Sequence, residues 1–231
     1  MSAYGGRMEL PKKQISAEKV LKPLYAAELT FGATVIVCSL ILFDHSVSVY
    51  GISYWGIRLE TVPILVIGLM ATSLMLFQAA SRLPDQKPLT YMAICFRVVG
   101  AGAILLLLTP YTAGTFFNWA HMTIGATFFL AQMATSAYMY IKLPKDFWLS
   151  SAILVQLLGG ILAMLSLPDN LLALMLQGEV LFQIGFALLV NRTLKVYLSH
   201  QGSQQMHSAA TDDSLSLKFE ESDVSQQKRN C

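Results

Sequence analysis

The chain has few charged residues for its length, and this shortage excludes most soluble folds. Only 13% of the 231 residues are charged, whereas 55% are hydrophobic. Soluble domains carry about 25% charged residues. The apolar residues gather in runs of about 20, the length of helix that crosses ~30 Å of hydrocarbon. The composition therefore predicts an all-α fold, a polytopic membrane helical bundle.

The sequence also lacks the short motifs that mark metal, nucleotide or nucleic-acid sites. Two of its three cysteines, Cys38 and Cys95, fall inside apolar runs, and no CxxC or HExxH spacing occurs. A P-loop, a GxSxG elbow and a GxxxG helix-pairing motif are absent as well. The basic leader is typical of orientation and anionic-lipid contact. We therefore expect no metal, no cofactor and no nucleic-acid partner, and we expect membrane lipids as partners.

Six apolar runs divide the chain into a leader, a membrane domain and a tail. Residues 1–23 form a basic cytoplasmic leader that Pro23 is expected to end, and residues 24–198 form a six-helix transmembrane domain. Residues 199–231 are polar and are expected to be a disordered cytoplasmic tail, because they include too few large apolar side chains to form a core. The predicted transmembrane spans are about 24–43, 62–80, 89–108, 119–141, 147–167 and 171–190.

The distribution of Lys and Arg between the loops predicts the orientation. Eleven basic residues lie in the leader and in the loops on its side of the membrane, against Arg58 alone on the other side. Such residues collect on the cytoplasmic side. We therefore expect both termini to be cytoplasmic, in a multi-pass protein of the cell membrane or an endomembrane.

Three charged residues fall inside predicted spans: Glu28, Arg97 and Glu179. A charge at mid-span costs roughly 2.5 to 3.5 kcal/mol on insertion scales, so each should have a partner or a function. Counted along the spans, Arg97 and Glu179 differ in depth by only about 6 Å. The spacing predicts a buried ion pair between them, with Glu28 as a competing partner for Arg97. A proton or ion path through all three is the alternative.

A second polar group belongs to the opposite, outer side of the membrane. Two histidines and two carboxylates among its members could bind zinc or form an acid–base pair. Their spacing matches no ligand motif, so we expect most of them to be surface charges and predict no metal site. The members are Asp44, His45, Ser53, Arg58, Glu60 and His121.

Two segments and one single residue of the sequence carry a family resemblance. The loop Gly51-Ile-Ser-Tyr-Trp-Gly-Ile-Arg-Leu-Glu60, the stretch from Ala120-His121 to Phe128, and Glu179 resemble Frag/DRAM-type six-span membrane proteins. The resemblance implies a role in membrane lipid organisation, in trafficking or autophagy-type regulation, or in remodelling of GPI lipids.

Three functional hypotheses follow. The resemblance and the lack of a catalytic motif favour a non-catalytic protein that organises, senses or binds lipid. An intramembrane lipid hydrolase or transferase is the first alternative, and it requires His121, Glu60 or Asp44 to converge with a nucleophile such as Ser53. A small transporter or proton channel is the second, and it requires the three intramembrane charges to line one path.

Overall fold

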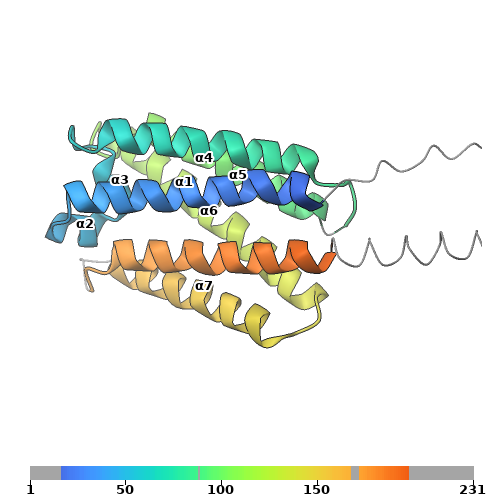
Figure 1. The fold of residues 1–231 in the computed structure, drawn as a ribbon. Coiled ribbons are helices and arrows are strands. Elements are labelled where there is room, and N and C mark those ends of the chain that lie inside the picture. Colours follow the sequence, from blue (N-terminus) through green and yellow to red (C-terminus); the bar gives the residue numbers. More distant parts are fainter. Residues whose placement is uncertain (1–16, 88, 168–171, 198–231) are drawn as a thin grey trace, which may run out of the picture.

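The computed structural model describes residues 17–87, 89–167 and 172–197, and within these ranges the chain is helical without a strand (Figure 1). The predicted all-helical class is confirmed. The predicted tail and residues 1–16 of the leader lie outside the described residues. The helices are α1 (Ala17–Ile41), α2 (His45–Tyr50), α3 (Ile52–Trp55), α4 (Val62–Arg82), α5 (Leu89–Leu108), α6 (Thr115–Lys142), α7 (Phe147–Ser166) and a last described helix, Met175–Tyr197.

The six long helices run in alternating directions and form one bundle (Figure 1). Along this bundle α1 packs against α4, α4 against α5, and α5 against α6. The short helices α2 and α3 cover one end, which we call the α3 end. The basic residues at the ends of the long helices lie at the opposite end, because α4 and α6 finish there at Arg82 and Lys142 and α1 begins there.

Five of the long helices are long and apolar enough to cross a membrane. Although α6 is the longest, with 28 residues, it is not one of the five. Asn118, His121 and Gln132 interrupt its apolar sequence. The five are Lys19–Ile41, Val62–Arg82, Leu89–Leu108, Phe147–Ser166 and Met175–Tyr197.

The first long helix begins earlier than predicted, because Pro23 lies inside it. A proline has no N–H to donate, so the carbonyl oxygen of Lys19, four residues before it, loses its helical partner. The Nη1 atom of Arg82 donates a hydrogen bond to that oxygen at 2.9 Å. The last turn of α4 thus replaces the hydrogen bond that Pro23 cannot make, and the helix continues through it.

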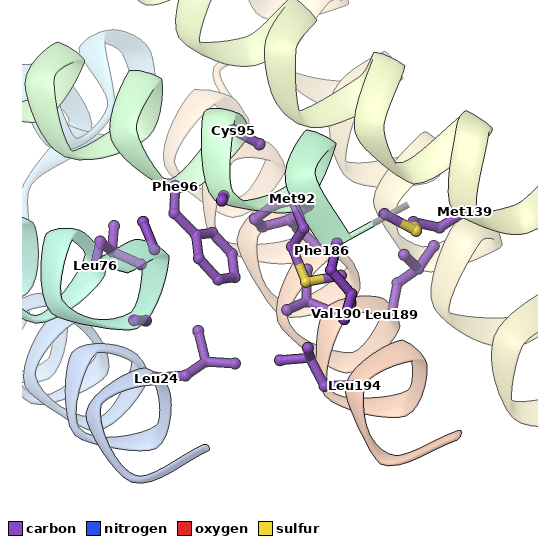
Figure 2. Packing of buried hydrophobic residues seen from close by; sticks show 14 of the residues in the cluster. Leu24, Leu76, Met92, Cys95, Phe96, Met139, Phe186, Leu189, Val190 and Leu194 are labelled. Atoms are coloured by element: carbon purple, nitrogen blue, oxygen red, sulfur yellow. The ribbon is translucent and has the colours of Figure 1, made fainter. Parts of the chain in front are cut away.

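All six long helices contribute to the main apolar core. Figure 2 shows Leu24, Phe96, Phe186 and Leu194 converging from α1, α5 and the last described helix. Among lipid chains, which are as apolar as leucine, dense packing stabilises helix contacts more than transfer out of water does. In a membrane, the stability of this core would therefore come mainly from its packing.

The backbones of α7 and the last described helix approach each other closely. A Cβ atom added to Gly178 would lie 2.4 Å from the backbone N of Ala163, and one added to Gly159 would lie 2.3 Å from the backbone N of Phe182. Both distances are below normal contact, so only glycine fits. GxxxG is absent, but Gly159 and Ala163 form a small-xxx-small pair that serves the same purpose.

Candidate functional site at the α3 end

The chain enters the α3 end through a capped short helix. The Oδ1 atom of Asp44 accepts a hydrogen bond from the backbone N–H of Val47 at 3.0 Å, which caps the start of α2. Helix α2 is capped at its end by Gly51, where φ is 66° and ψ is −155°. Only glycine adopts this combination readily. The chain turns there into α3, which carries Ser53.

Buried contacts hold α3 in place. The side chain of Trp55 is completely buried, and its Nε1–H donates to the carbonyl of Leu42 at 3.0 Å. The Oγ1 of Thr61 donates to the carbonyl of Trp55 at 2.8 Å, so Thr61, which precedes α4, anchors the short helix. The α3 backbone is thereby tied to the end of α1 on one side and to α4 on the other.

Glu179 connects the last described helix to the start of α3. Its Oε2 atom accepts a hydrogen bond from the backbone N–H of Ile52 at 2.7 Å. The carboxylate also lies against Gly51, where an added Cβ would be 2.3 Å from Oε2. Glu179 therefore fixes the position of the turn that precedes Ser53.

Ser53 and His121 are hydrogen-bonded to each other. The Oγ atom of Ser53 lies 2.8 Å from Nε2 of His121, and Nδ1 of the same imidazole lies 2.7 Å from the carbonyl oxygen of Thr109. A carbonyl oxygen can only accept, so Nδ1 must carry the hydrogen. In the neutral ring Nε2 is then an acceptor, and the hydroxyl of Ser53 donates to it.

Three tyrosines surround this pair. Tyr50 stacks with Tyr54 and with Tyr111, at centroid distances of 6.0 and 6.1 Å, and Tyr111 meets the His121 ring edge-on at 5.7 Å. Burial, together with the neighbouring phenols of Tyr50 and Tyr54, raises the pKa of Tyr111 to about 12. Tyr111 therefore stays a neutral phenol at any physiological pH, with an apolar ring and a polar tip.

The Ser53–His121 pair has the geometry needed to make a hydroxyl nucleophilic. The imidazole accepts the proton, and the Thr109 carbonyl orients the ring by holding its other nitrogen. Both side chains are half-buried, so neither is sealed inside the bundle. Among the described residues no three His, Cys, Asp or Glu side chains come together as metal ligands.

The other predicted members of the outer group do not join this pair. Asp44 caps α2, and His45 is exposed beside it. Arg58 and Glu60 form a partly exposed ion pair, with Nε and Oε2 3.7 Å apart, and the Arg58 guanidinium lies over the Tyr54 ring at 5.7 Å. Of the groups that the enzyme hypothesis named, His121 does meet Ser53, whereas Glu60 and Asp44 do not; the second partner of His121 is a backbone carbonyl.

The predicted ion pair between Arg97 and Glu179 is wrong. Glu179 binds the Ile52 N–H, whereas Arg97 is exposed on α5 beside a polar hollow of about 330 Å³ that Asp85 also lines. The depth estimate failed because the last described helix begins at Met175. Glu179 is therefore only about 6 Å from the α3 end, and Arg97 is about 17 Å from it.

Glu28, the predicted competitor for Arg97, has a different partner. The Nδ2 atom of Asn191 donates to both oxygens of its carboxylate, at 3.0 and 2.8 Å. This contact joins α1 to the last described helix. Glu28, Arg97 and Glu179 thus occupy three separate places, and within the described residues no hydrogen bond or ion pair links any two of them.

Sequence analysis missed several groups that shape the site. The Thr109 carbonyl is a backbone atom, so no residue pattern could have indicated it. Tyr50 and Tyr111 look in sequence like ordinary aromatic residues at span ends, and only the fold stacks them. Gln132 and Gln156, polar residues inside apolar runs, were visible signals; both are fully buried, with side-chain N and O atoms unpaired within the described part of the chain.

An apolar groove of about 500 Å³ lies apart from this cluster, between α1 and α4. Its lining includes Leu29, Ile67 and Ala71. Leu29 and Ile67 are exposed on the outside of the bundle, so the groove belongs to the surface that would face lipid.

Comparison with known proteins yields no match: no family model, no curated protein and no solved structure matches this chain. The resemblance to Frag/DRAM-type proteins therefore stays a prediction, and functional conclusions rest on the geometry of the site.

Proposed function

We propose that this chain is a multi-pass membrane protein of six transmembrane helices that binds a membrane lipid at its α3 end and thereby has a lipid-organising or sensing role. The observation that carries the proposal is the assembly of Ser53, His121 and three stacked tyrosines at one end of an apolar bundle. The end of a membrane-spanning bundle lies at the level of the lipid head groups, which are polar ligands.

The aromatic residues around the site support a position at the membrane boundary. Phe116 and Trp119, in the first turns of α6, are 76% and 70% exposed. Large exposed aromatic rings are typical of the interface between lipid and water. A ligand that reaches the neighbouring His121 from that side would come from the bilayer.

The position of the basic residues supports an orientation with the α3 end outside. Arg82, Lys142 and Lys145 lie at the opposite end of the bundle, and Arg58 lies at the α3 end. Both termini are then cytoplasmic, in a cell membrane or endomembrane. The sixth span is α6. Its packing against α5 and α7 stabilises it in the membrane despite its polar residues.

Lipid binding is tested by thermal unfolding of the purified protein in detergent with added phosphatidylcholine, phosphatidylethanolamine or phosphatidylinositol. A ligand that binds only the native state raises Tm. One of these lipids should raise Tm in the wild type, and the rise should shrink in Tyr54→Ala/Tyr111→Ala. The control is Tyr140→Ala, whose ring lies at the opposite end beside Lys145. An equal rise in all three proteins, or none in the wild type, would contradict the site.

Orientation is tested separately by labelling with a membrane-impermeant maleimide. In a background with the native cysteines replaced by serine, Glu60→Cys should react in intact cells or sealed vesicles of known sidedness. Lys145→Cys should react only after permeabilisation. The reverse pattern would overturn the proposed orientation.

A further inference from the structure

We propose that Ser53 and His121 form a nucleophile–base pair that cleaves or transfers the acyl ester of a lipid bound at the α3 end. The inference rests on the proposed function, because it takes the bound lipid as the substrate. It goes beyond that function in assigning a reaction to the site.

Two consecutive hydrogen bonds carry the inference. The hydroxyl of Ser53 donates to Nε2 of His121 at 2.8 Å, and the opposite ring nitrogen donates to the Thr109 carbonyl at 2.7 Å. A nucleophile, a base within hydrogen-bond reach and a third group that orients the base are what serine acyl transfer requires. Here the orienting group is a neutral backbone carbonyl instead of a carboxylate.

Ser53 meets a histidine 68 positions away, and the carbonyl that orients that histidine lies 12 positions before it. Ser53 lies on α3, His121 on α6, and Thr109 follows α5. Ser39 and Ser73, inside long helices, donate to the carbonyl four residues before them, but the short helix α3 offers Ser53 no such carbonyl. Ser53 instead donates to an imidazole 68 residues away.

The reaction balances without a metal or a redox partner. The Ser53 oxygen attacks the ester carbonyl carbon and its proton passes to Nε2 of His121, which gives a tetrahedral oxyanion and an imidazolium. The oxyanion collapses, the bond to the lipid alcohol breaks, and that alcohol leaves with the proton from Nε2. Water or a second lipid alcohol then attacks the acyl-serine, His121 takes its proton, and the proton returns to the Ser53 oxygen as the acyl group leaves.

Glu179 acts in this scheme as a positioning residue. Its carboxylate holds the Ile52 N–H, one residue before Ser53, and packs against Gly51. It touches neither the hydroxyl nor the imidazole by hydrogen bond. Loss of this carboxylate should move Ser53 relative to His121. A displacement of about 1 Å can reduce a reaction rate by roughly 100-fold.

The substrate class follows from the level of the site in the proposed orientation. The ester bonds of glycerolipids lie just below the head groups, beside the tyrosine and tryptophan rings that mark a membrane boundary. The stacked rings of Tyr50, Tyr54 and Tyr111 would contact the glycerol and upper acyl region. The acyl-ester carbonyl is therefore the electrophile that a bound lipid would offer Ser53.

The first test uses a fluorophosphonate, an electrophile that modifies activated serines. The wild-type protein in detergent micelles should gain one adduct by intact mass, and peptide mapping should place it on Ser53. The modification rate should follow one ionisation as pH rises, because only the neutral imidazole accepts the proton. In His121→Gln the rate should fall by about 10²- to 10⁴-fold, the usual contribution of a general base.

Matched variants separate chemistry from folding. Ser48→Ala and His45→Gln change a serine and a histidine on α2 of the same end, and neither residue bonds Ser53 or His121 within the described structure. Both should react like the wild type. Glu179→Gln should lower the rate without changing its pH midpoint. Peptide mapping of the adduct uses the wild-type protein, so the test remains decisive even if Ser53→Ala does not fold.

Turnover is measured with phosphatidylcholine carrying a fluorescent acyl chain, in nanodiscs of phosphatidylcholine. Release of the labelled acid, or its transfer to a second lipid, with loss in Ser53→Ala is the expected result. If the lipid raises Tm but no adduct forms on Ser53, the proposal that Ser53 is a nucleophile is refuted and the proposal of lipid binding stands. An adduct on Ser53 without any lipid effect on Tm or turnover would instead remove the lipid as its substrate.

Discussion

The carboxylate of Glu179 accepts a hydrogen bond from the backbone N–H of Ile52 at 2.7 Å, across 127 positions of sequence. The contact places a side chain of the last described helix against the turn at Gly51. That turn carries the chain into α3 and sets where Ser53 meets His121. The candidate site therefore depends on a residue that does not contact the reacting groups.

Gly51→Ala should destabilise the protein and separate Ser53 from His121. The positive φ costs a non-glycine residue about 1–3 kcal/mol, and the new Cβ would lie 2.3 Å from Glu179 Oε2. Thermal unfolding in detergent should show a clearly lower Tm. Gly32→Ala is the control, since a Cβ there meets nothing within 4 Å. Equal Tm values for the two variants would contradict the proposed close fit.

Gly178→Ala should loosen the contact between α7 and the last described helix. Its Cβ would lie 2.4 Å from the Ala163 backbone N, and two packed backbones cannot move apart without losing their neighbours. Overpacking of this kind costs about 1–3 kcal/mol. Gly125→Ala, where a Cβ meets nothing within 4 Å, is the matched control on α6. Unfolding in detergent measures both, and an unchanged Tm for Gly178→Ala would refute the contact.

Arg82→Met should weaken the start of α1, because the Lys19 carbonyl loses the hydrogen bond that α4 donates to it. The loss should be about 0.5–1.5 kcal/mol, the usual net value of one hydrogen bond. In a Pro23→Ala background the effect should shrink, because the alanine would supply the missing helical N–H. A double-mutant cycle measures this coupling, with Lys142→Met as the control. A coupling energy of zero would show that Arg82 does not substitute for the proline.

Asp146 should make stability depend on pH in the acidic range. The backbone N–H of Leu149 and the side chain of Arg192 lower the pKa of Asp146 below its ordinary value of 3.8. The folded-state pKa is thus below the unfolded one, so the contribution is complete above pH 3.8 and is lost as pH falls through the folded value.

A comparison of the wild type with Asp146→Asn tests whether stability is lost, and not gained, as pH falls. Asparagine keeps an oxygen for the Leu149 cap but loses the charge that attracts Arg192. The Tm difference should be largest at neutral pH, shrink at acidic pH and shrink with added salt, because the pair is partly exposed. A difference that grows on acidification would reverse the assignment.

The extent of most helices could be predicted because it follows from local chemistry. The predicted span 89–108 coincides with α5, and 147–167 ends one residue beyond α7. Apolar runs of this length have few alternatives in a membrane, and proline or polar residues end them. The start of α1 could not be predicted from Pro23, because the compensating donor comes from Arg82 on another helix.

From the order of residues alone it follows that this is a helical, apolar chain, that polar groups inside its spans need partners, and that Ser53 and His121 belong to one end. The identity of the partners depends on the folded arrangement: Ile52 N–H for Glu179, Asn191 for Glu28, His121 for Ser53, and the Thr109 carbonyl for His121. The cost of an unpaired polar group in a low-dielectric interior requires that some partner exist. Which atom becomes the partner depends on where each helix begins. Some partners are backbone N–H or C=O groups, which every residue but proline has in the same form and which no residue pattern distinguishes.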